Sequence, residues 1–373
     1  MSFSNNRLLS PSQVLPGALP GGTSDENSPT TESQTENFFE PDARKATLAS
    51  GGFGRALKDE DRWMVASTVI GGDTVEVGLV ADGHGGSAAA SHCKRHAVPY
   101  LFERANGDAS AESLRRAGRA AFDRLHAEVR DTGLTDGTVL TLCIINLTRS
   151  EVTTLHAGDC TAVLIPHQAG SSLKAQRLTA EHRLEESKFE RKRVAELGGT
   201  VARLQHPVTK EPGGPLRVFP GGLALARGIG DLDAGNVISC VPATSTLGLS
   251  AFGCGGWDIV VASDGVWDSL SYGAVFKACR QSLSAPPART AELIVDYAVK
   301  SRHAFDNTGA KVPRDDTTCV VLRYRSLDEM AVSCVKKGCE DIGVVEPTVK
   351  DDFVQDEVYA TDVTDDAVAP KVV

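Results

Sequence analysis

Several carboxylates in this sequence stand at the ends of apolar runs or in adjoining glycine-rich turns. Asp82 follows Val75–Ala81 and opens the turn Asp82-Gly83-His84-Gly85-Gly86, and Asp264 follows the run 259–262. The same placement is found for Glu60, Asp61 and Asp315. Strand ends are held rigidly by their sheet, so carboxylates that are distant in sequence can converge on one ion. Hard oxygen ligands select Mg²⁺ or Mn²⁺ over zinc.

Two such ions, roughly 3.5–4 Å apart, can clamp a phosphoryl oxygen and activate a water for attack on phosphorus. The pattern therefore predicts a metal-dependent phosphate-ester hydrolase that needs no covalent intermediate. His84 adds a titratable imidazole that can protonate the leaving alkoxide. A single Asp-Gly most often makes only a turn, so the prediction depends on the whole set.

The apolar runs predict the elements that carry these carboxylates. Trp63–Ile70 and Val75–Ala81 are β-branched runs joined by Gly71-Gly72-Asp73, the pattern of two strands and a tight turn. The further expected strands are 139–147, 151–156, 161–165, 217–226, 258–262 and 317–323, and the expected helices are 87–103, 111–129 (after a Ser110 cap), 185–197, 271–284 and 288–303. Helices segregated between runs of strands favour an α+β fold of antiparallel sheets with helices packed outside.

Composition separates one domain from two polar ends. Residues 1–45 are rich in Ser, Thr, Asn, Pro, Gly and Glu, which predicts a disordered leader. Residues 327–373 are predicted to be an acidic, partly disordered tail. The region between them, 46–326, is the expected catalytic domain of this 373-residue chain.

Charge and cysteine content exclude several classes of protein. A net charge of −10 argues against a nucleic-acid or anionic-membrane partner bound through a broad positive surface. Every apolar run is shorter than the roughly 18 residues of a membrane span. Nine cysteines without a Cys-x-x-Cys pair suit reduced thiols, so we expect a cytoplasmic or nuclear protein. We also expect a monomer.

The ordered motifs of residues 50–325 resemble those of the metal-dependent protein phosphatases, also called protein phosphatase type 2C. The matching segments are 59–63 (Asp-Glu-Asp-Arg-Trp), 80–86 (Val-Ala-Asp-Gly-His-Gly-Gly), 136–138 (Asp-Gly-Thr), 157–160 (Ala-Gly-Asp-Cys), 178–182 (Leu-Thr-Ala-Glu-His), 223–231 (Leu-Ala-Leu-Ala-Arg-Gly-Ile-Gly-Asp), 262–268 (Ala-Ser-Asp-Gly-Val-Trp-Asp) and 314–318 (Arg-Asp-Asp-Thr-Thr).

The resemblance implies a central β-sandwich of two antiparallel sheets flanked on both sides by helices, and hydrolysis of phosphoserine and phosphothreonine in proteins. Asp82 would bridge two Mg²⁺ or Mn²⁺ ions, and His84 would be the general acid. The remaining implied roles are Glu60 and the Gly83 carbonyl on one ion, Asp264 and Asp315 on the other, Asp61 in support, Asp159 and Asp268 on a weaker third ion, and Arg55 on the phosphate. An arginine fork suits bidentate contact with phosphoryl oxygens.

The segment from Arg55 to Asp61 departs from the family pattern. The family usually places its arginine four residues before the ligand glutamate, whereas Arg55 stands five before Glu60. Glu60 is preferred because Glu60-Asp61-Arg62-Trp63 continues the pattern, and Asp59 remains an alternative ligand. Residues 183–222 are the expected flap, and they lack the tryptophan of the plant hormone co-receptor branch. Glu181 and Asp136 also replace the usual Asp and Ser of their motifs.

Four rival interpretations carry less weight. Cys143 and Arg149 have a Cys-x5-Arg spacing, but the run between them is apolar and lacks glycine, which predicts a strand instead of a phosphate cradle. Asp231-Leu232-Asp233 hints at an aspartyl nucleophile, yet Gly235 stands where that motif needs Thr or Val. His92 and His96 lack a third zinc ligand. A pseudophosphatase scaffold would have lost ligands, and none is missing here.

Overall fold

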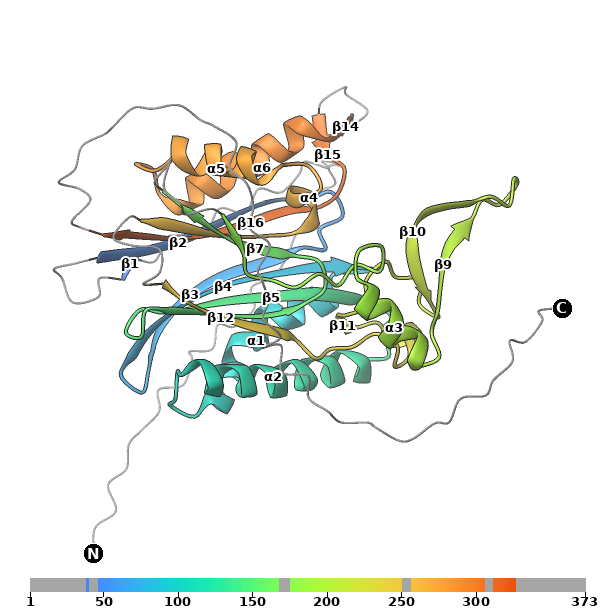
Figure 1. The fold of residues 1–373 in the computed structure, drawn as a ribbon, viewed down its shortest axis with the longest axis horizontal. Helices are drawn as coiled ribbons and strands as arrows, with labels where there is room; N and C mark the ends of the chain where they lie inside the picture. The colour runs from blue at the N-terminus through green and yellow to red at the C-terminus, as the bar shows by residue number, and fades with distance from the viewer. Residues whose placement is uncertain (1–37, 40–45, 168–174, 250–255, 306–310, 327–373) are drawn as a thin grey trace, which may run out of the picture.

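Two stacked sheets form the centre of the molecule, with helices on both outer faces (Figure 1). The computed structural model describes residues 38–39, 46–167, 175–249, 256–305 and 311–326. The predicted acidic tail, 327–373, lies outside the described residues, as does the predicted leader, 1–45, except for Phe38–Phe39. These two residues form a short strand that pairs with the first strand of the domain.

The strands are β1 (Phe38–Phe39), β2 (Ala46–Arg55), β3 (Arg62–Ile70), β4 (Asp73–His84), β5 (Gly137–Asn146), β6 (Glu151–Ala157), β7 (Thr161–Pro166), β8 (Gln176–Arg177), β9 (Thr200–Gln205), β10 (Pro212–Phe219), β11 (Ile229–Gly230), β12 (Ala243–Gly248), β13 (Trp257–Ala262), β14 (His303–Phe305), β15 (Lys311–Pro313) and β16 (Thr317–Ser326). The helices are α1 (Ala88–Ala105), α2 (Ala111–Asp131), α3 (Lys188–Glu196), α4 (Asp264–Trp267), α5 (Tyr272–Gln281), α6 (Pro287–Ser301) and the 3₁₀ turn η1 (Leu232–Ala234).

Both sheets are antiparallel. The first has the order β1-β2-β16-β13-β7-β8, and the second has the order β12-β6-β5-β4-β3 with β11 added to β5. Helices α1 and α2 cover the second sheet, and α5 and α6 cover the first (Figure 1). The predicted α+β sandwich flanked by helices is therefore confirmed. The hairpin β9–β10 projects from the sandwich on one side (Figure 1).

Three apolar layers hold these sheets and helices together. Between the sheets, Val80 and Ile145 pack with Val261 and Leu322. The helices are attached to the outer sheet faces by two further clusters, one under α1 and α2 and one under α5 and α6. Strands buried on both faces read as nearly continuous apolar runs, as β5 and β13 mostly do.

Local sequence signals determine the hairpin and the first helices as predicted. Strands β3 and β4 pair from Ile70 with Asp73 to Arg62 with Ala81, which places Asp82 just beyond the start of β3. The Ser110 side chain accepts a hydrogen bond from the Ser113 amide and caps α2. The predictions of α1, α2, α5 and α6 are confirmed within a few residues.

The expected strand over residues 217–226 is wrong. Strand β10 ends at Phe219 because Pro220 has no amide hydrogen and Gly221-Gly222 turn the chain back, so that Val218 donates to the Leu223 carbonyl. Strand β12 was not predicted, because its Ala-Thr-Ser-Thr-Leu-Gly sequence is only weakly apolar. Among the described residues, no helix is long and apolar enough to cross a membrane.

A buried ion pair joins β13 and β16 to the helical layer. Arg323 is 2% exposed and donates from Nε and Nη2 to the two carboxylate oxygens of Asp258, each at 2.8 Å. Its Nη1 donates to the Ser282 and Ala285 carbonyls after α5, and His167 Nε2 lies 2.9 Å from Asp258 Oδ1. The pair is thus fully hydrogen-bonded, which is the condition under which a buried charge is tolerated.

Replacing Asp258 by Asn should destabilise the domain by about 3–5 kcal/mol, because Arg323 would keep a buried charge without its counter-ion. Urea denaturation followed by circular dichroism measures the change. Arg149→Ala, which removes a surface pair between Arg149 (47% exposed) and Asp73, is the control and should cost less than about 1 kcal/mol. Equal losses for the two variants would contradict the central role of the buried pair.

The same pair predicts a pH dependence of stability. Burial alone would raise the pKa of Asp258, but hydrogen bonds from Arg323 and His167 hold it at about 2. A depressed pKa contributes stability above the unfolded value of about 3.9, and this contribution is lost as the pH falls towards 2. The difference in unfolding free energy between the wild type and Asp258→Asn should therefore narrow between about pH 4 and pH 2. A constant difference across that window would contradict this assignment.

Candidate metal centre

Five predicted carboxylates converge at one end of the sandwich. Asp82 lies near the end of β4, and Asp264 begins α4 just after β13. Asp61 precedes β3, Asp315 precedes β16, and Asp159 lies between β6 and β7. Register explains their meeting, because Arg62 pairs with Ala81 in one sheet, and Ala262 pairs with both Thr161 and Cys319 in the other. The structure therefore brings together strand ends that are up to 250 residues apart in sequence.

Burial, followed by mutual repulsion, raises the pKa values of the carboxylates in this group. Burial raises the pKa of Asp82 well above its ordinary value, and the charges of Asp61, Asp264 and Asp159 raise it further. Burial likewise raises the pKa of Asp61 to about 7. The pKa of Asp264 also reaches about 7, through burial and then the charge of Asp159. Carboxylates in this state bind a cation with large electrostatic gain.

The loop that carries Glu60 and Asp61 is held by one carboxylate. Asp316 accepts backbone N–H bonds from Leu57 at 2.5 Å and Lys58 at 2.7 Å through Oδ1, and from Glu60 at 2.6 Å and Asp61 at 3.1 Å through Oδ2. Burial opposes the charge of Asp316, but these bonds prevail and lower its pKa. Asp316 thereby fixes Glu60 and Asp61 beside the strand end that carries Asp82.

Two glycines allow the close backbone approaches that this arrangement needs. A Cβ on Gly83 would lie 2.6 Å from the Glu60 carbonyl oxygen, and one on Gly265 would lie 2.3 Å from the Asp316 carbonyl oxygen. Each glycine follows a predicted ligand, Asp82 or Asp264. The Asp-Gly pairs therefore supply a carboxylate and also the space in which the Glu60 and Asp316 segments pack.

His84 is paired with a residue to which the sequence assigned no role. Its Nε2 lies 2.5 Å from Oδ1 of Asp231, whose side chain is 2% exposed. Burial by itself lowers the pKa of His84, but the hydrogen bond and charge of Asp231 outweigh it, and the net pKa is raised. Asp231 thus orients the His84 imidazole and favours its protonated form. In the sequence, only its place at the end of the 223–231 motif indicated a role for Asp231.

Basic side chains neutralise part of the carboxylate group, among them Arg302, whose Nη1 lies 3.7 Å from Asp268 Oδ2. Arg183 donates to Asp159, Asp264 and Asp268, and Lys58 Nζ lies 2.8 Å from Asp315 Oδ1. Across the described ranges, no three or more His, Cys, Asp and Glu side chains are arranged to hold a metal ion. Arg183 and Lys58 together contact four of the predicted ligands.

The donor chemistry nevertheless fits Mg²⁺ or Mn²⁺. All side-chain donors are carboxylate oxygens, as hard divalent ions prefer. Both oxygens of Asp61 are buried and have no hydrogen-bond partner. A buried carboxylate without a partner is costly, and a nearby divalent ion would remove that cost.

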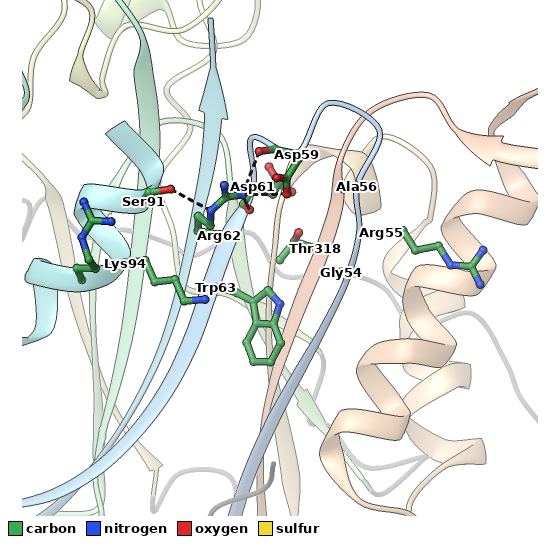
Figure 2. Close-up of a pocket in the computed structure, with 11 residues that line it drawn as sticks. Gly54, Arg55, Ala56, Asp59, Asp61, Arg62, Trp63, Ser91, Lys94 and Thr318 are labelled. Atoms are coloured by element: carbon green, nitrogen blue, oxygen red, sulfur yellow. Dashed lines mark hydrogen bonds and ion pairs between the residues drawn. The ribbon is translucent and has the colours of Figure 1, made fainter. Parts of the chain in front are cut away.

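Arg55 does not join the carboxylates. Its Nη2 lies 2.7 Å from Asp296 Oδ1 on α6, and Figure 2 shows its side chain directed to the opposite side from Asp59 and Asp61. The predicted phosphate contact of Arg55 stays a prediction. Asp59 is 73% exposed and pairs with Arg62. The preference for Glu60 over Asp59 as the ligand in this segment stays a prediction.

A pocket of about 590 Å³ adjoins this segment (Figure 2). Its lining includes Asp61, Trp63 and the basic side chains of Arg62, Lys94 and Arg95. Arg62 is fixed there by hydrogen bonds from Nε to Ser91 Oγ at 3.0 Å and from Nη1 to the Asp61 carbonyl at 2.7 Å. The basic wall gives the acidic centre a neighbouring surface of opposite charge.

The rival sites are not supported. Cys143 is buried within β5, where burial raises the pKa of its thiol, while Arg149 pairs with Asp73 beyond the strand. His92 bonds to Glu128 and its ring lies 4.5 Å from that of His96, on the α1 surface. Both pairs are structural.

Two motif residues that depart from the family pattern have structural partners. Asp136 Oδ2 accepts from the Ala89 amide at 2.7 Å and so caps α1 from another segment. Glu181 accepts from the Arg183 amide at 2.9 Å and pairs with Arg177. Next to it, His182 Nδ1 accepts from the Gly158 amide, which supports the turn before Asp159.

Comparison with known proteins agrees with this architecture. The family model described as "Protein phosphatase 2C" matches residues 61–307. The chain is 34% identical over 311 residues to "Probable protein phosphatase 2C 12" of Arabidopsis thaliana, covering 81% of this chain and 66% of that protein. It is 36% identical over 281 residues to "Probable protein phosphatase 2C 33" of Oryza sativa subsp. japonica, covering 73% of this chain and 60% of that protein.

Solved structures show the same fold. "Crystal structure of serine-threonine phosphatase 2C from Toxoplasma gondii" aligns with a TM-score of 0.60 at 18% identity, covering 80% of this chain and 100% of that chain. "Structure of a C.elegans sex determining protein" aligns with a TM-score of 0.59 at 21% identity, covering 74% and 64%. The matched region spans 66% and 60% of the two curated plant relatives' own lengths.

Replacing Asp231 by Asn should lower the pKa of His84, because the imidazolium loses its counter-charge while its burial remains. A raised pKa keeps the ring charged to higher pH, so in the variant the ring should lose its proton at lower pH. NMR titration of the His84 ring protons in metal-free protein measures this. Glu128→Gln, which alters the pair with His92, is the control, and an unchanged His84 titration in Asp231→Asn would contradict the assignment.

Proposed function

The chain belongs to the protein phosphatase 2C family, and we propose that it hydrolyses phosphoserine and phosphothreonine in protein substrates. The observation that supports this most directly is the convergence of Asp82 with Asp61, Asp159, Asp264 and Asp315. Fold and carboxylate set together fit a phosphoric monoester hydrolase. Because every predicted ligand is present, catalysis is favoured over a pseudophosphatase scaffold.

The proposed cofactor is a pair of Mg²⁺ or Mn²⁺ ions. The resemblance also implies a third ion that binds more weakly. Bound ions would supply a water of lowered pKa and positive charge opposite the phosphoryl oxygens. Asp82 would contact both core ions. Glu60 and the Gly83 carbonyl would hold one of them and Asp264 and Asp315 the other, with Asp61 in support. Asp159 and Asp268 would hold the third ion. Asp316 keeps Glu60 and Asp61 in place for this purpose.

The raised pKa of His84 favours the protonated ring that a general acid requires. Asp231 holds its Nε2, so Nδ1 is the nitrogen that donates a proton to the departing serine or threonine oxygen. The proton moves from Nδ1 to that oxygen as its bond to phosphorus breaks. Asp231 keeps the ring oriented and charged, in the way that a carboxylate supports a catalytic imidazole.

Substrate binding would use the basic residues beside the centre. Arg62, Lys94 and Arg95 line the pocket next to Asp61 and can attract a phosphorylated chain. Arg55 would reach the phosphate only after leaving Asp296, with which it forms a partly exposed pair. The flap, formed by α3 and β9–β10, stands beside the centre and is the proposed contributor to substrate choice (Figure 1).

Manganese-dependent hydrolysis of p-nitrophenyl phosphate and of a phosphothreonine peptide tests this function. Asp82→Asn should lower kcat by at least about 100-fold, equivalent to about 2.7 kcal/mol of barrier, and EDTA should abolish activity. Asp131→Asn, at the end of α2, is the matched control and should retain activity.

Two results would count against the proposal. Turnover by metal-loaded protein that does not exceed the Asp82→Asn background would remove the enzyme assignment. Hydrolysis confined to phosphotyrosine peptides would remove the serine/threonine assignment and leave a phosphatase of different specificity.

A further inference from the structure

One cationic side chain lies inside the carboxylate group. Arg183 contacts three carboxylates at once, with Nε 2.9 Å from Asp159, Nη1 2.8 Å from Asp268 and Nη2 3.2 Å from Asp264. The side chain is only 30% exposed. All three of its guanidinium nitrogens are therefore directed to residues expected at the metal centre.

The backbone of Arg183 is fixed in the position that makes these contacts possible. Arg183 forms an antiparallel bridge with Leu225, its amide donates to Glu181 Oε1 at 2.9 Å, and its carbonyl accepts from the Ser187 amide at 2.9 Å. The carboxylate of Glu181 is engaged by Arg177. The charge of Arg183 is consequently directed at Asp159, Asp264 and Asp268.

Lys58 makes a different kind of contact. Its ammonium group reaches one carboxylate, Asp315, and is 50% exposed. Arg183 instead presents a planar fork to three carboxylates from two segments, Asp159 between β6 and β7 and the pair Asp264 and Asp268 at the two ends of α4. A tethered cation of this kind also has a high effective concentration at its site, because it cannot diffuse away.

We propose that Arg183 is a built-in counter-ion that holds the position where Asp159 and Asp268, with Asp264, would otherwise bind a third divalent ion. The inference rests on the proposed metal-dependent function and adds a residue that limits metal binding. An ion entering at Asp159 and Asp268 must first break both of their bonds to Arg183. The contact between Arg183 and Asp264 is the longest of the three. Asp264 can therefore bind a core ion while Arg183 remains bonded to Asp159 and Asp268.

The structural consequence concerns the metal-free protein. Without Arg183, Asp159 and Asp264 would lose the cation that they contact, and Asp268 would keep only the 3.7 Å contact with Arg302 Nη1. The repulsion among the three carboxylates would then favour unfolding. Arg183 should therefore stabilise the metal-free fold and weaken binding of the third ion, two effects of opposite sign that one substitution can separate.

The test counts Mn²⁺ bound to full-length protein by electron paramagnetic resonance of free Mn²⁺ and by titration calorimetry. Arg183→Gln should bind one more Mn²⁺ per chain than the wild type, or bind the weakest ion about tenfold more tightly. Its Tm should be lower than that of the wild type in EDTA, and Mn²⁺ should raise it by a larger increment. Arg183→Lys, which keeps the charge but cannot contact all three carboxylates at once, should bind the weakest ion with an affinity between those of the wild type and Arg183→Gln.

Two further variants locate the effect. Arg183→Gln combined with Asp268→Asn should lose the additional ion, because one of its proposed ligands is gone. Arg124→Gln, which removes an arginine bonded to Glu103 and Glu128 on α1 and α2, should leave Mn²⁺ binding unchanged.

The possible outcomes separate this inference from the proposed function. Equal Mn²⁺ number and affinity in the wild type and Arg183→Gln, with Mn²⁺-dependent hydrolysis intact, would overturn the role of Arg183 alone. An additional ion that persists in the double variant would also overturn it. Absence of Mn²⁺ binding by every variant and by the wild type would overturn both proposals.

Discussion

Repulsion among carboxylates gathered at one end of the sandwich is the constraint on which the other features of this protein depend. Asp61, Asp82 and Asp264 all have raised pKa values because they are desolvated and face one another. A flexible chain would separate them. Here each is attached at or next to a strand end, and the apolar layers between and outside the sheets keep those ends together.

Hydrogen bonds and cations distribute this repulsion over the surrounding residues. Asp316 is itself an acid, yet four amide N–H groups satisfy it, so it fixes the loop before β3 and remains charged. Arg183 and Lys58 neutralise carboxylates directly. Asp231 raises the pKa of His84 and so favours a protonated imidazole beside the same group. The centre is thus a balance of charges in which a cation that enters at Asp159 and Asp268 competes with Arg183.

The sequence predicted the parts of the site that depend on local pattern. The hairpin leading to Asp82 follows from two β-branched runs and a glycine turn, and it is confirmed by the β3–β4 register. The prediction of a strand over 217–226 failed because the apolar residues Leu223 to Ala226 continue the pattern past Pro220, where the chain turns. Asp316 and Asp231 carried no distinguishing local signal, since their roles depend on segments more than 100 residues away.

The sequence by itself determined the chemistry available to this protein: oxygen ligands for a hard metal ion, an imidazole beside them, and the ordered motifs of one phosphatase family. Residue types and short-range spacing suffice for that, because ligand preference is a property of the side chain. Only the tertiary structure decided which charges meet. It paired His84 with Asp231, turned Arg55 to Asp296 and directed Arg183 to three acids, because such pairings depend on how distant strand ends and loops pack.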